Sequence, residues 1–427
     1  MWAEDAAEAD TVDRSSVALN LGDGVVYRNP TEYISYYLDP ARSVDIEQIT
    51  KHRDRFQPVR RKELEFGYID DAIWLQLPLR NASATPQTRY VLLETNWMES
   101  MRVWLSAGGD DRLILDQDQH MPFRTREIPH QNLVTRFTLE PGQAATLWLR
   151  YSSRGSTALP INIETEFSFL QRSQVRASKS MIFFSLMLLF ITVAGLSYFL
   201  FRYTIFPIYV CYATTVLLYV MHRDGFAFQY LWPSWPDWNA FASLPLGAGL
   251  GLFAILFSRQ YLSTSKRYPK TDRLLLVCMF LLAGLVPYGL LVDEQGAKQI
   301  ASLWVFLVAV ILLALGIRSW MDMGRRMIFF VAGWLGVVVA SLAMLLGGFF
   351  GAEISRETTL DAIRLAMVFD ALMLGFAMAE RVLQIRKERD VALSRQLEAL
   401  QDNLDMHERL SKLEARYADA LESARSS

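Results

Sequence analysis

Few residues in this chain have the types and spacing that chemistry requires. Gly108-Gly109-Asp110-Asp111 is similar to the catalytic signature of diguanylate cyclases. Paired glycines readily adopt positive φ, however, so the sequence predicts a hairpin turn here. The chain shows no phosphate-binding glycine loop, nucleophile elbow or zinc signature, and its five histidines and two cysteines lack ligand spacing. The sequence therefore predicts no catalytic site, no metal site and no cofactor.

A second group of residues combines aromatic rings with polar groups, as in sugar-binding sites. Such sites place a ring under the C–H face of a sugar, while Arg, Asn or acidic groups bind its hydroxyls. One tryptophan in a turn and three residues in a single loop fit this pattern. The predicted ligand-binding residues are Trp97, Arg124, Arg126 and His130. Three other tryptophans lie among aliphatic residues within strands and are predicted to be core residues: Trp74, Trp104 and Trp148.

Asp370 lies near the middle of a long apolar segment. An acid at that depth in a membrane helix costs a few kcal/mol, so its side chain is expected to face the bundle interior or water. Hydroxyl groups on other segments are its predicted partners: Thr214, Thr215, Tyr219 and Ser341. Two roles stay open, an interhelical hydrogen bond for packing and a role in signalling or proton transfer.

The first half of the chain contains the elements that would position the loop residues. From about Thr31 to Phe169, short runs rich in β-branched and aromatic residues alternate with turn signals. This spacing predicts a β-sandwich of jelly-roll type, which we assign to residues 31–172. Residues 1–30 are predicted to be a loosely ordered lead-in, and residues 45–55 a short helix.

Seven apolar segments of about twenty residues follow, each long enough to cross a bilayer as a helix. Their predicted ranges, within a domain at 173–383, are 178–201, 205–221, 238–258, 273–291, 299–317, 327–350 and 360–382. The predicted fold is thus an extracellular β-sandwich plus an all-α seven-helix transmembrane bundle.

Lys and Arg gather in alternate loops between these segments, and the opposite loops are acidic. This asymmetry predicts a multi-pass protein of a bacterial inner membrane, in contact with lipid, with a periplasmic sandwich and a cytoplasmic C-terminus. Because Met1–Asp5 resembles no signal peptide, we expect that a signal segment has been removed.

Residues 384–427 are charged and free of Pro and Gly, which predicts a cytoplasmic helix. Leu393, Leu397, Leu400 and Leu404 alternate steps of four and three, as in a coiled-coil seam, and the phase shifts at Asp405–Arg409. We expect a homodimer through this coiled coil, with a single solvated helix as the alternative. The near-zero net charge argues against nucleic acid as a partner.

Several short stretches, together with the order of the parts, are similar to one family. They are Trp74-Leu75, Met101–Leu105, Pro129–Asn132, Tyr230–Pro233 and Ala377–Arg381. The chain resembles the bacterial seven-transmembrane receptors with diverse intracellular signalling modules, and its β region resembles the second type of extracellular sensor domain in that family. The resemblance implies a sandwich similar to carbohydrate-binding modules that binds a small extracellular ligand, with a glycan as one candidate.

The resemblance also implies a cytoplasmic output, namely a histidine kinase, a diguanylate cyclase or a phosphatase. Residues 413–425 resemble the helix that leads into a kinase dimerisation domain. We therefore expect the input half of a hybrid sensor histidine kinase, acting on a cytoplasmic signalling domain or a partner kinase. A cyclase receptor, a transporter and a scaffold without catalysis are the alternatives. The scarcity of polar groups at mid-membrane disfavours the transporter.

Overall fold

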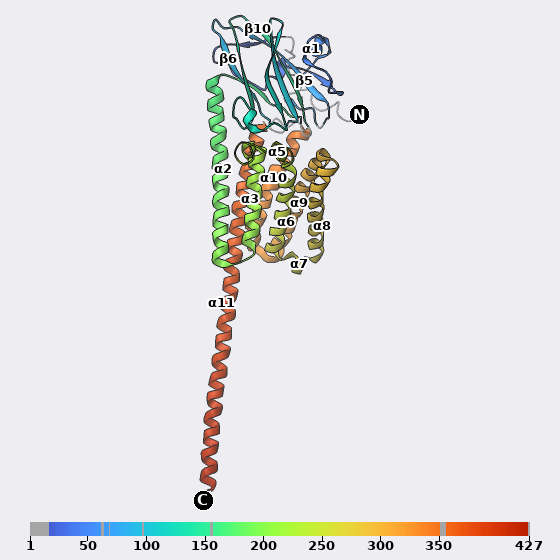
Figure 1. Cartoon of the computed structure of the whole chain (residues 1–427). Helices are drawn as coiled ribbons and strands as arrows, with labels where there is room; N and C mark the ends of the chain where they lie inside the picture. The colour runs from blue at the N-terminus through green and yellow to red at the C-terminus, as the bar shows by residue number, and fades with distance from the viewer. Residues whose placement is uncertain are drawn as a thin grey trace.

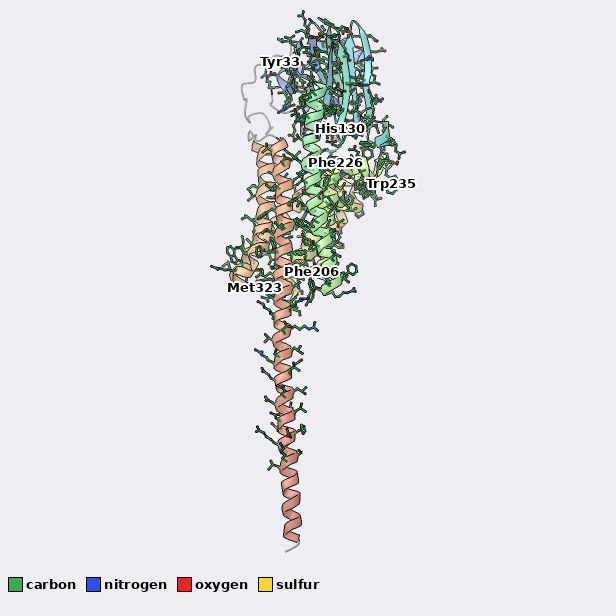
Figure 2. The ribbon with its side chains drawn as sticks, turned by 90° about the vertical axis from the view of Figure 1, so that its left-hand side faces the viewer. Tyr33, His130, Phe206, Phe226, Trp235 and Met323 are labelled. Atoms are coloured by element: carbon green, nitrogen blue, oxygen red, sulfur yellow. The ribbon has the colours of Figure 1, made fainter. Side chains whose placement is uncertain are left out.

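The structure is a computed structural model that describes residues 17–60, 64–67, 69–95, 98–153, 157–350 and 356–425. A β domain stands on a bundle of helices, and one helix extends far beyond the bundle on the opposite side (Figure 1). His130 and Phe226 lie where the β domain meets the bundle, and Phe206 and Met323 lie at the other end of the bundle (Figure 2).

The β domain consists of two sheets, as the sequence predicts for a sandwich. Sheet A has the strand order β4-β3-β5-β10-β7-β8, and β1 pairs with β5. Its strands are β1 (Leu19–Leu21), β3 (Ser35–Asp39), β4 (Gln57–Pro58), β5 (Ala72–Asn81), β7 (Ser100–Ala107), β8 (Asp110–Asp118) and β10 (Ala144–Ser152). Sheet B has the order β2-β11-β6-β9. Its strands are β2 (Tyr27–Arg28), β6 (Gln87–Leu93), β9 (Leu133–Leu139) and β11 (Ile161–Glu164).

The described part of the predicted lead-in belongs to this sandwich. Strand β1 pairs in parallel with β5, and β2 pairs with β11, so residues 17–30 add a strand to each sheet. Leu19 and Leu21 are fully buried in the core between the sheets. The acidic composition that suggested a loose segment hides an alternation of apolar and polar residues too short to read as a strand.

The three core tryptophans are buried, but they occupy the outer face of sheet A. Along β5, β7 and β10 the odd-numbered residues fill the core between the sheets, and the even-numbered residues point outward. Trp74 and Trp104 stack at 5.4 Å between ring centroids, and Trp148 completes the cluster. A flap made of α1 (Ile46–Ile49) and the short 3-10 helix Arg53–Arg55 covers them.

Local signals set the turn and the flap. Gly108 and Gly109 join β7 to β8 at φ angles of 64° and 92°, which confirms the predicted hairpin turn. In the flap, the Asp45 carboxylate accepts a hydrogen bond of 3.0 Å from the Gln48 N–H and caps α1. The predicted helix at 45–55 is therefore present as two short turns.

Ten α-helices follow the sandwich in the described chain. They are α2 (Glu166–Phe201), α3 (Ile205–Arg223), α4 (Phe226–Tyr230), α5 (Pro236–Phe241), α6 (Ser243–Leu262), α7 (Thr264–Arg267), α8 (Pro269–Leu291), α9 (Glu294–Met323), α10 (Ile328–Phe350) and α11 (Arg356–Arg425). Among the described residues, five helices are long and apolar enough to cross a membrane: α2, α3, α8, α9 and α11. Helices α6 and α10 pack within the same bundle.

Two helices extend well beyond their apolar segments. Helix α2 begins at Glu166, where the Thr165 hydroxyl caps it by accepting from the Ser168 N–H, and so rises beside the sandwich. Helix α11 continues without interruption from Arg356 to Arg425. Hydropathy marks only the part of a helix that fits a bilayer, so it misses a polar extension that contains no Gly or Pro.

Candidate functional site

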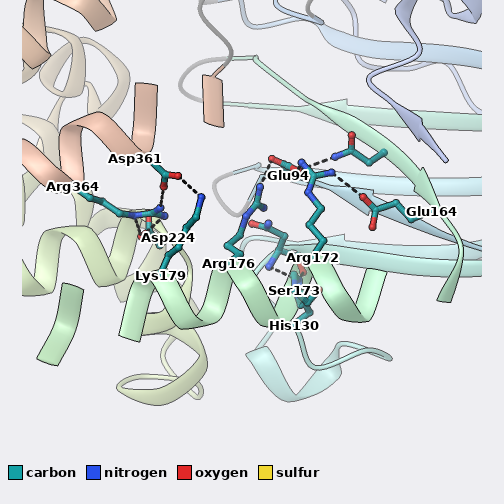
Figure 3. A network of polar contacts seen from close by, with 12 residues as sticks. Glu94, His130, Glu164, Arg172, Ser173, Arg176, Lys179, Asp224, Asp361 and Arg364 are labelled. Atoms are coloured by element: carbon teal, nitrogen blue, oxygen red, sulfur yellow. Dashed lines mark hydrogen bonds and ion pairs between the residues drawn. The ribbon is translucent and has the colours of Figure 1, made fainter. Parts of the chain in front are cut away.

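Buried ion pairs hold the upper turns of α2 against sheet B (Figure 3). Arg172 lies 2.9 Å from Glu94 and 2.8 Å from Glu164, and Arg176 lies 2.9 Å from Glu94. Glu94 follows β6 and Glu164 ends β11, so two arginines one turn apart on α2 bind both acids. No side chain in this group is more than 17% exposed. Removing one partner of such a buried pair typically costs about 3–5 kcal/mol. We call the contact between sheet B and the upper turns of α2, formed by Glu94, Glu164, Arg172 and Arg176, the joint.

His130 belongs to this joint. The Asn132 N–H donates to His130 Nδ1 over 3.1 Å, a shorter contact than the 3.4 Å to the Asn132 carbonyl, so the ring proton is assigned to Nε2. Nε2 lies 3.2 Å from Ser173 Oγ on α2, and the ring packs against Phe169. Burial is the main cause that lowers the pKa of His130 to about 4; the Asn132 carbonyl, to which the charged ring would donate, opposes this shift, and nearby arginine charges add to it. His130 is therefore a neutral part of the joint at pH 7.

The loop before His130 makes a second contact with the helices. The Phe123 N–H donates to the Pro233 carbonyl over 2.9 Å, and the Phe123 ring meets Phe228 of α4 edge-on at 5.6 Å. The Arg126 guanidinium lies 4.7 Å and 5.6 Å from the centroids of these two rings. Burial lowers the pKa of Arg126 to about 10, so it stays charged at neutral pH. This loop ties the sandwich to the α3–α6 connection.

The four predicted ligand-binding residues therefore have different surroundings. Arg126 and His130 take part in the joint, and the side chain of Arg124 is exposed on the same loop. Trp97 lies outside the described residues. A role in ligand binding stays a prediction for all four.

A groove of about 360 Å³ opens on the outer face of sheet A, beside the β7–β8 turn. One row across three strands contributes Pro78, Thr146 and Ser106, and the rim includes Arg53 of the flap and Asp111 of β8. Strand β8 runs for nine residues, about 30 Å, from this turn toward the joint, so the groove lies at the far end of the sandwich. Sequence reasoning missed it because three separate strands and the flap contribute its lining.

The groove lining mixes apolar side chains with a few polar groups, and the Ser106 hydroxyl donates to the Asp111 carboxylate. Arg53 and Asp111 supply a cation and an anion, and the hydroxyls of Ser106 and Thr146 add donors and acceptors. The neighbouring tryptophan cluster is buried and presents no open ring to the groove. The groove therefore suits a small molecule that has both hydrogen-bonding groups and C–H faces.

A second ion-pair cluster joins α2 to α11 below the arginines (Figure 3). Lys179 Nζ lies 2.6 Å from Asp361 of α11, and Arg364 Nη1 lies 2.6 Å from the same carboxylate. Arg364 Nε and Nη2 also donate to Asp224, which follows α3, at 3.0 Å and 2.8 Å. The sandwich, α2, α3 and α11 are therefore connected by two ion-pair clusters that follow one another along α2.

Asp370 fixes α11 to α3 deeper in the bundle. Its side chain is almost fully buried and accepts a hydrogen bond of 2.5 Å from Tyr212, while the Tyr209 hydroxyl donates to the Ala371 carbonyl over 2.7 Å. The prediction that Asp370 bonds to Thr214, Thr215, Tyr219 or Ser341 is therefore wrong. Tyr209 and Tyr212 are three residues apart and share the face of α3 that meets α11. The hydropathy of α3 does not reveal which of its faces turns inward.

Comparison with protein-family models identifies both parts of the chain. Residues 177–381 match the model described as 7TM diverse intracellular signalling, and residues 31–165 match 7TMR-DISM extracellular 2. None of the curated proteins compared with the chain matches it. The matched ranges coincide with the helical bundle and the sandwich described above. The chain belongs to the seven-transmembrane receptors with diverse intracellular signalling modules, and it is a membrane receptor with an extracellular sensor domain and a role in intracellular signalling.

Proposed function

We propose that this receptor binds a small polar ligand in its sandwich and passes the signal to a cytoplasmic output through movement of α11. One observation carries the proposal: α11 is a single unbroken helix whose first turns are ion-paired to α2, and α2 is clamped to the sandwich. A shift of the sandwich thus reaches α11 through helices and buried ion pairs. A ligand drives the shift only by the difference in its affinity for the two arrangements.

The ligand in this proposal is a glycan. The groove on sheet A supports it, since hydroxyls and one charge of each sign line the groove, and the hydroxyl groups of sugars pair with such groups. The resemblance of the sandwich to carbohydrate-binding modules points to the same class of ligand.

The proposed topology has seven passes through a bacterial inner membrane, with the sandwich in the periplasm. Basic residues of the loops lie at the far end of the bundle, for example Arg267 and Arg325, as expected on a cytoplasmic face. Beyond this face α11 would pair with a second copy as a coiled coil and act on a histidine kinase, either in the same protein or as a partner.

The coupling step is tested in a fusion of the chain to the catalytic core of a histidine kinase, with autophosphorylation in membranes as the readout. We expect Lys179→Glu and Asp361→Lys each to change the basal level at least twofold, because each places like charges together between α2 and α11. The double variant restores an opposite-charge pair and is expected to return toward the original level.

Lys412→Glu is the matched control, since Lys412 pairs with Glu408 on an exposed stretch of α11 far from the joint. Effects of the two single variants that merely add in the double variant would contradict coupling through this contact.

The ligand site is tested by titrating the full chain, in detergent, with the soluble glycans that a glycan array identifies. We expect Arg53→Ala and Asp111→Asn to weaken binding about tenfold or more, because each removes a charged hydrogen-bonding group from the groove. Arg126→Ala and Trp97→Ala test the residues that the sequence predicts to bind the ligand. Loss of binding in these two variants with intact binding in the groove variants would place the ligand at those residues instead.

A further inference from the structure

The upper turns of α2 expose large apolar side chains to water. Phe167 is 77% exposed and Leu170 is 57% exposed. At about 1.5 Å per residue they lie about 21 Å and 16 Å above Met181, where the apolar segment of α2 begins. Lipid tails do not reach that height, so hydrocarbon does not cover these two side chains.

Both side chains lie on the face of α2 that turns away from the rest of the molecule. Consecutive residues of an α-helix are rotated by about 100°. Relative to Lys179, which contacts α11, Leu170 lies about 180° and Phe167 about 120° around the helix. The arginines that bind the sandwich, Arg172 and Arg176, lie within about 60° of Lys179, in the direction of rotation opposite to that of Phe167. We call the side with Phe167, Leu170 and Gln174 the open face of α2.

By the same helical rotation, Met181, Leu188 and Phe199 continue the open face into the membrane-spanning part of α2, with Ser185, Thr192 and Gly195 between them. The three large side chains are between 43% and 67% exposed in this chain. No atom of the chain lies within 4 Å of a Cβ placed on Gly195. In a bilayer, a second helix packs on such an exposed face through van der Waals contact.

A second exposed apolar stripe lies on α11 beyond the bundle. Its leucines are between 54% and 62% exposed in this chain: Leu393, Leu397, Leu400 and Leu404. In the proposed topology they lie in the cytoplasm, again out of reach of lipid. Their four-three spacing is that of a helix that pairs with another helix.

The leucine stripe turns toward the side of α11 on which α2 stands. Arg386 of α11 lies 4.3 Å from the ring centroid of Phe201, the last residue of α2. Leu393 and Leu397 are within about 20° of Arg386 around the helix axis. In the view of Figure 1, α11 leans toward the side of α2 as it leaves the bundle.

We propose that a second copy of the chain packs on the open face of α2, so that α2 lies beside its counterpart while the two α11 helices pair below. One two-fold axis along the membrane normal relates both contacts, and each buries an apolar stripe that water otherwise surrounds. The inference rests on the proposed coiled-coil dimer and adds α2 as its membrane and extracellular contact. The helix that clamps the sandwich is then also the helix that meets the second copy.

Disulfide cross-linking in membranes tests this dimer. Both native cysteines, Cys211 and Cys278, lie within the bundle, so the sandwich and the upper turns of α2 carry no cysteine. In a cysteine-free variant of the full chain, Leu170→Cys and Phe167→Cys probe α2, and Leu397→Cys probes α11. The matched controls are Thr138→Cys, exposed on β9, and Arg395→Cys, on the opposite face of α11.

We expect a covalent dimer of twice the chain mass for the α2 probes and for Leu397→Cys, and at least fivefold less for either control. Cross-linking at Leu397 without cross-linking at Leu170 and Phe167 overturns the inference and leaves the coiled-coil dimer standing. Cross-linking at Leu170 alone also overturns it, since one axis then does not relate the two stripes. Failure at all three positions overturns the coiled-coil dimer as well. A product of a different mass assigns the open face of α2 to another protein.

Discussion

Glu94 and His130 show how single side chains join the sensor domain to the membrane helices. Glu94 binds two arginines of α2, and His130 contacts Ser173 of the same helix. Glu94 pairs with the arginines through its negative charge, whereas His130 is held neutral mainly by burial, with two nearby arginine charges adding to the effect. The joint therefore tolerates neutral pH and is expected to weaken in acid.

The pH dependence of the joint follows from His130. Its pKa is about 4 in the folded chain and 6.5 in the unfolded chain, so the unfolded chain binds more protons between these values. The contribution of neutral His130 to the free energy of unfolding is therefore fully present above pH 6.5. It decreases as the pH falls toward 4, by up to about 3 kcal/mol.

Thermal unfolding between pH 4 and pH 7 measures this effect. We expect His130→Asn to flatten the profile, since its amide oxygen is able to accept from the Asn132 N–H but does not titrate. Equal slopes for the two proteins would rule out His130 as the source.

Helix α2 and helix α11 carry the connection between the domains. Above the bundle, α2 is bound to sheet B through its arginines, and α11 is bound to α2 and to Asp224, which follows α3. These contacts differ in strength. Lys179 and Asp361 are 49% and 32% exposed, whereas Arg364 and Asp224 are 13% and 6% exposed. The contact to α3 is expected to be the stronger anchor of α11.

Alanine substitutions separate the two anchors. Arg364→Ala leaves the buried Asp224 with its pair to Arg223 and is expected to cost about 1.5–3 kcal/mol, as for hydrogen bonds to a charged group. Lys179→Ala is expected to cost less than about 1 kcal/mol. Thermal stability of the detergent-solubilised chain gives both values. Arg364→Lys is the informative companion, because an ammonium group does not reproduce the planar donor fork. A loss of stability for Lys179→Ala equal to that for Arg364→Ala would contradict this ranking.

The whole molecule is a sensor domain, a bundle and one long helix connected without a flexible linker in the described chain (Figure 1). A rotation of α11 at its ion pairs with α2 and Asp224 would therefore be transmitted along the whole helix. In the proposed dimer, the output depends on the phase of the leucine stripe relative to the second copy. This phase repeats every seven residues in a coiled coil.

Deletions in α11 test this dependence on phase. Removal of residues 391–397 takes out one heptad and is expected to retain ligand-dependent output in the kinase fusion. Removal of residues 391–394 rotates the following part by about 50° at 3.5 residues per turn and is expected to lock or silence the output. Equal effects of the two deletions would show that the output does not read helix phase.

Much of the fold is predictable from the sequence because its signals are local. The apolar segments, the alternating strands, the Gly108-Gly109 turn and the unbroken polar composition of α11 each lie within one stretch of chain. The two-sheet sandwich, the helical bundle and the family membership follow from them. The extension of α2 above the bundle was not predicted, because hydropathy identifies the residues that lie in the bilayer and does not show how far the helix continues in water.

The sequence by itself determined the class of the protein, since bilayer thickness and strand alternation constrain short stretches of residues independently of the rest of the chain. Only the tertiary structure decided which distant residues meet. It brings Glu94 to Arg172, Asp361 to Lys179 and Asp370 to Tyr212, and it forms the groove from three strands and the flap. The physical reason is that helix rotation and strand order decide which faces meet, and no single segment contains that information.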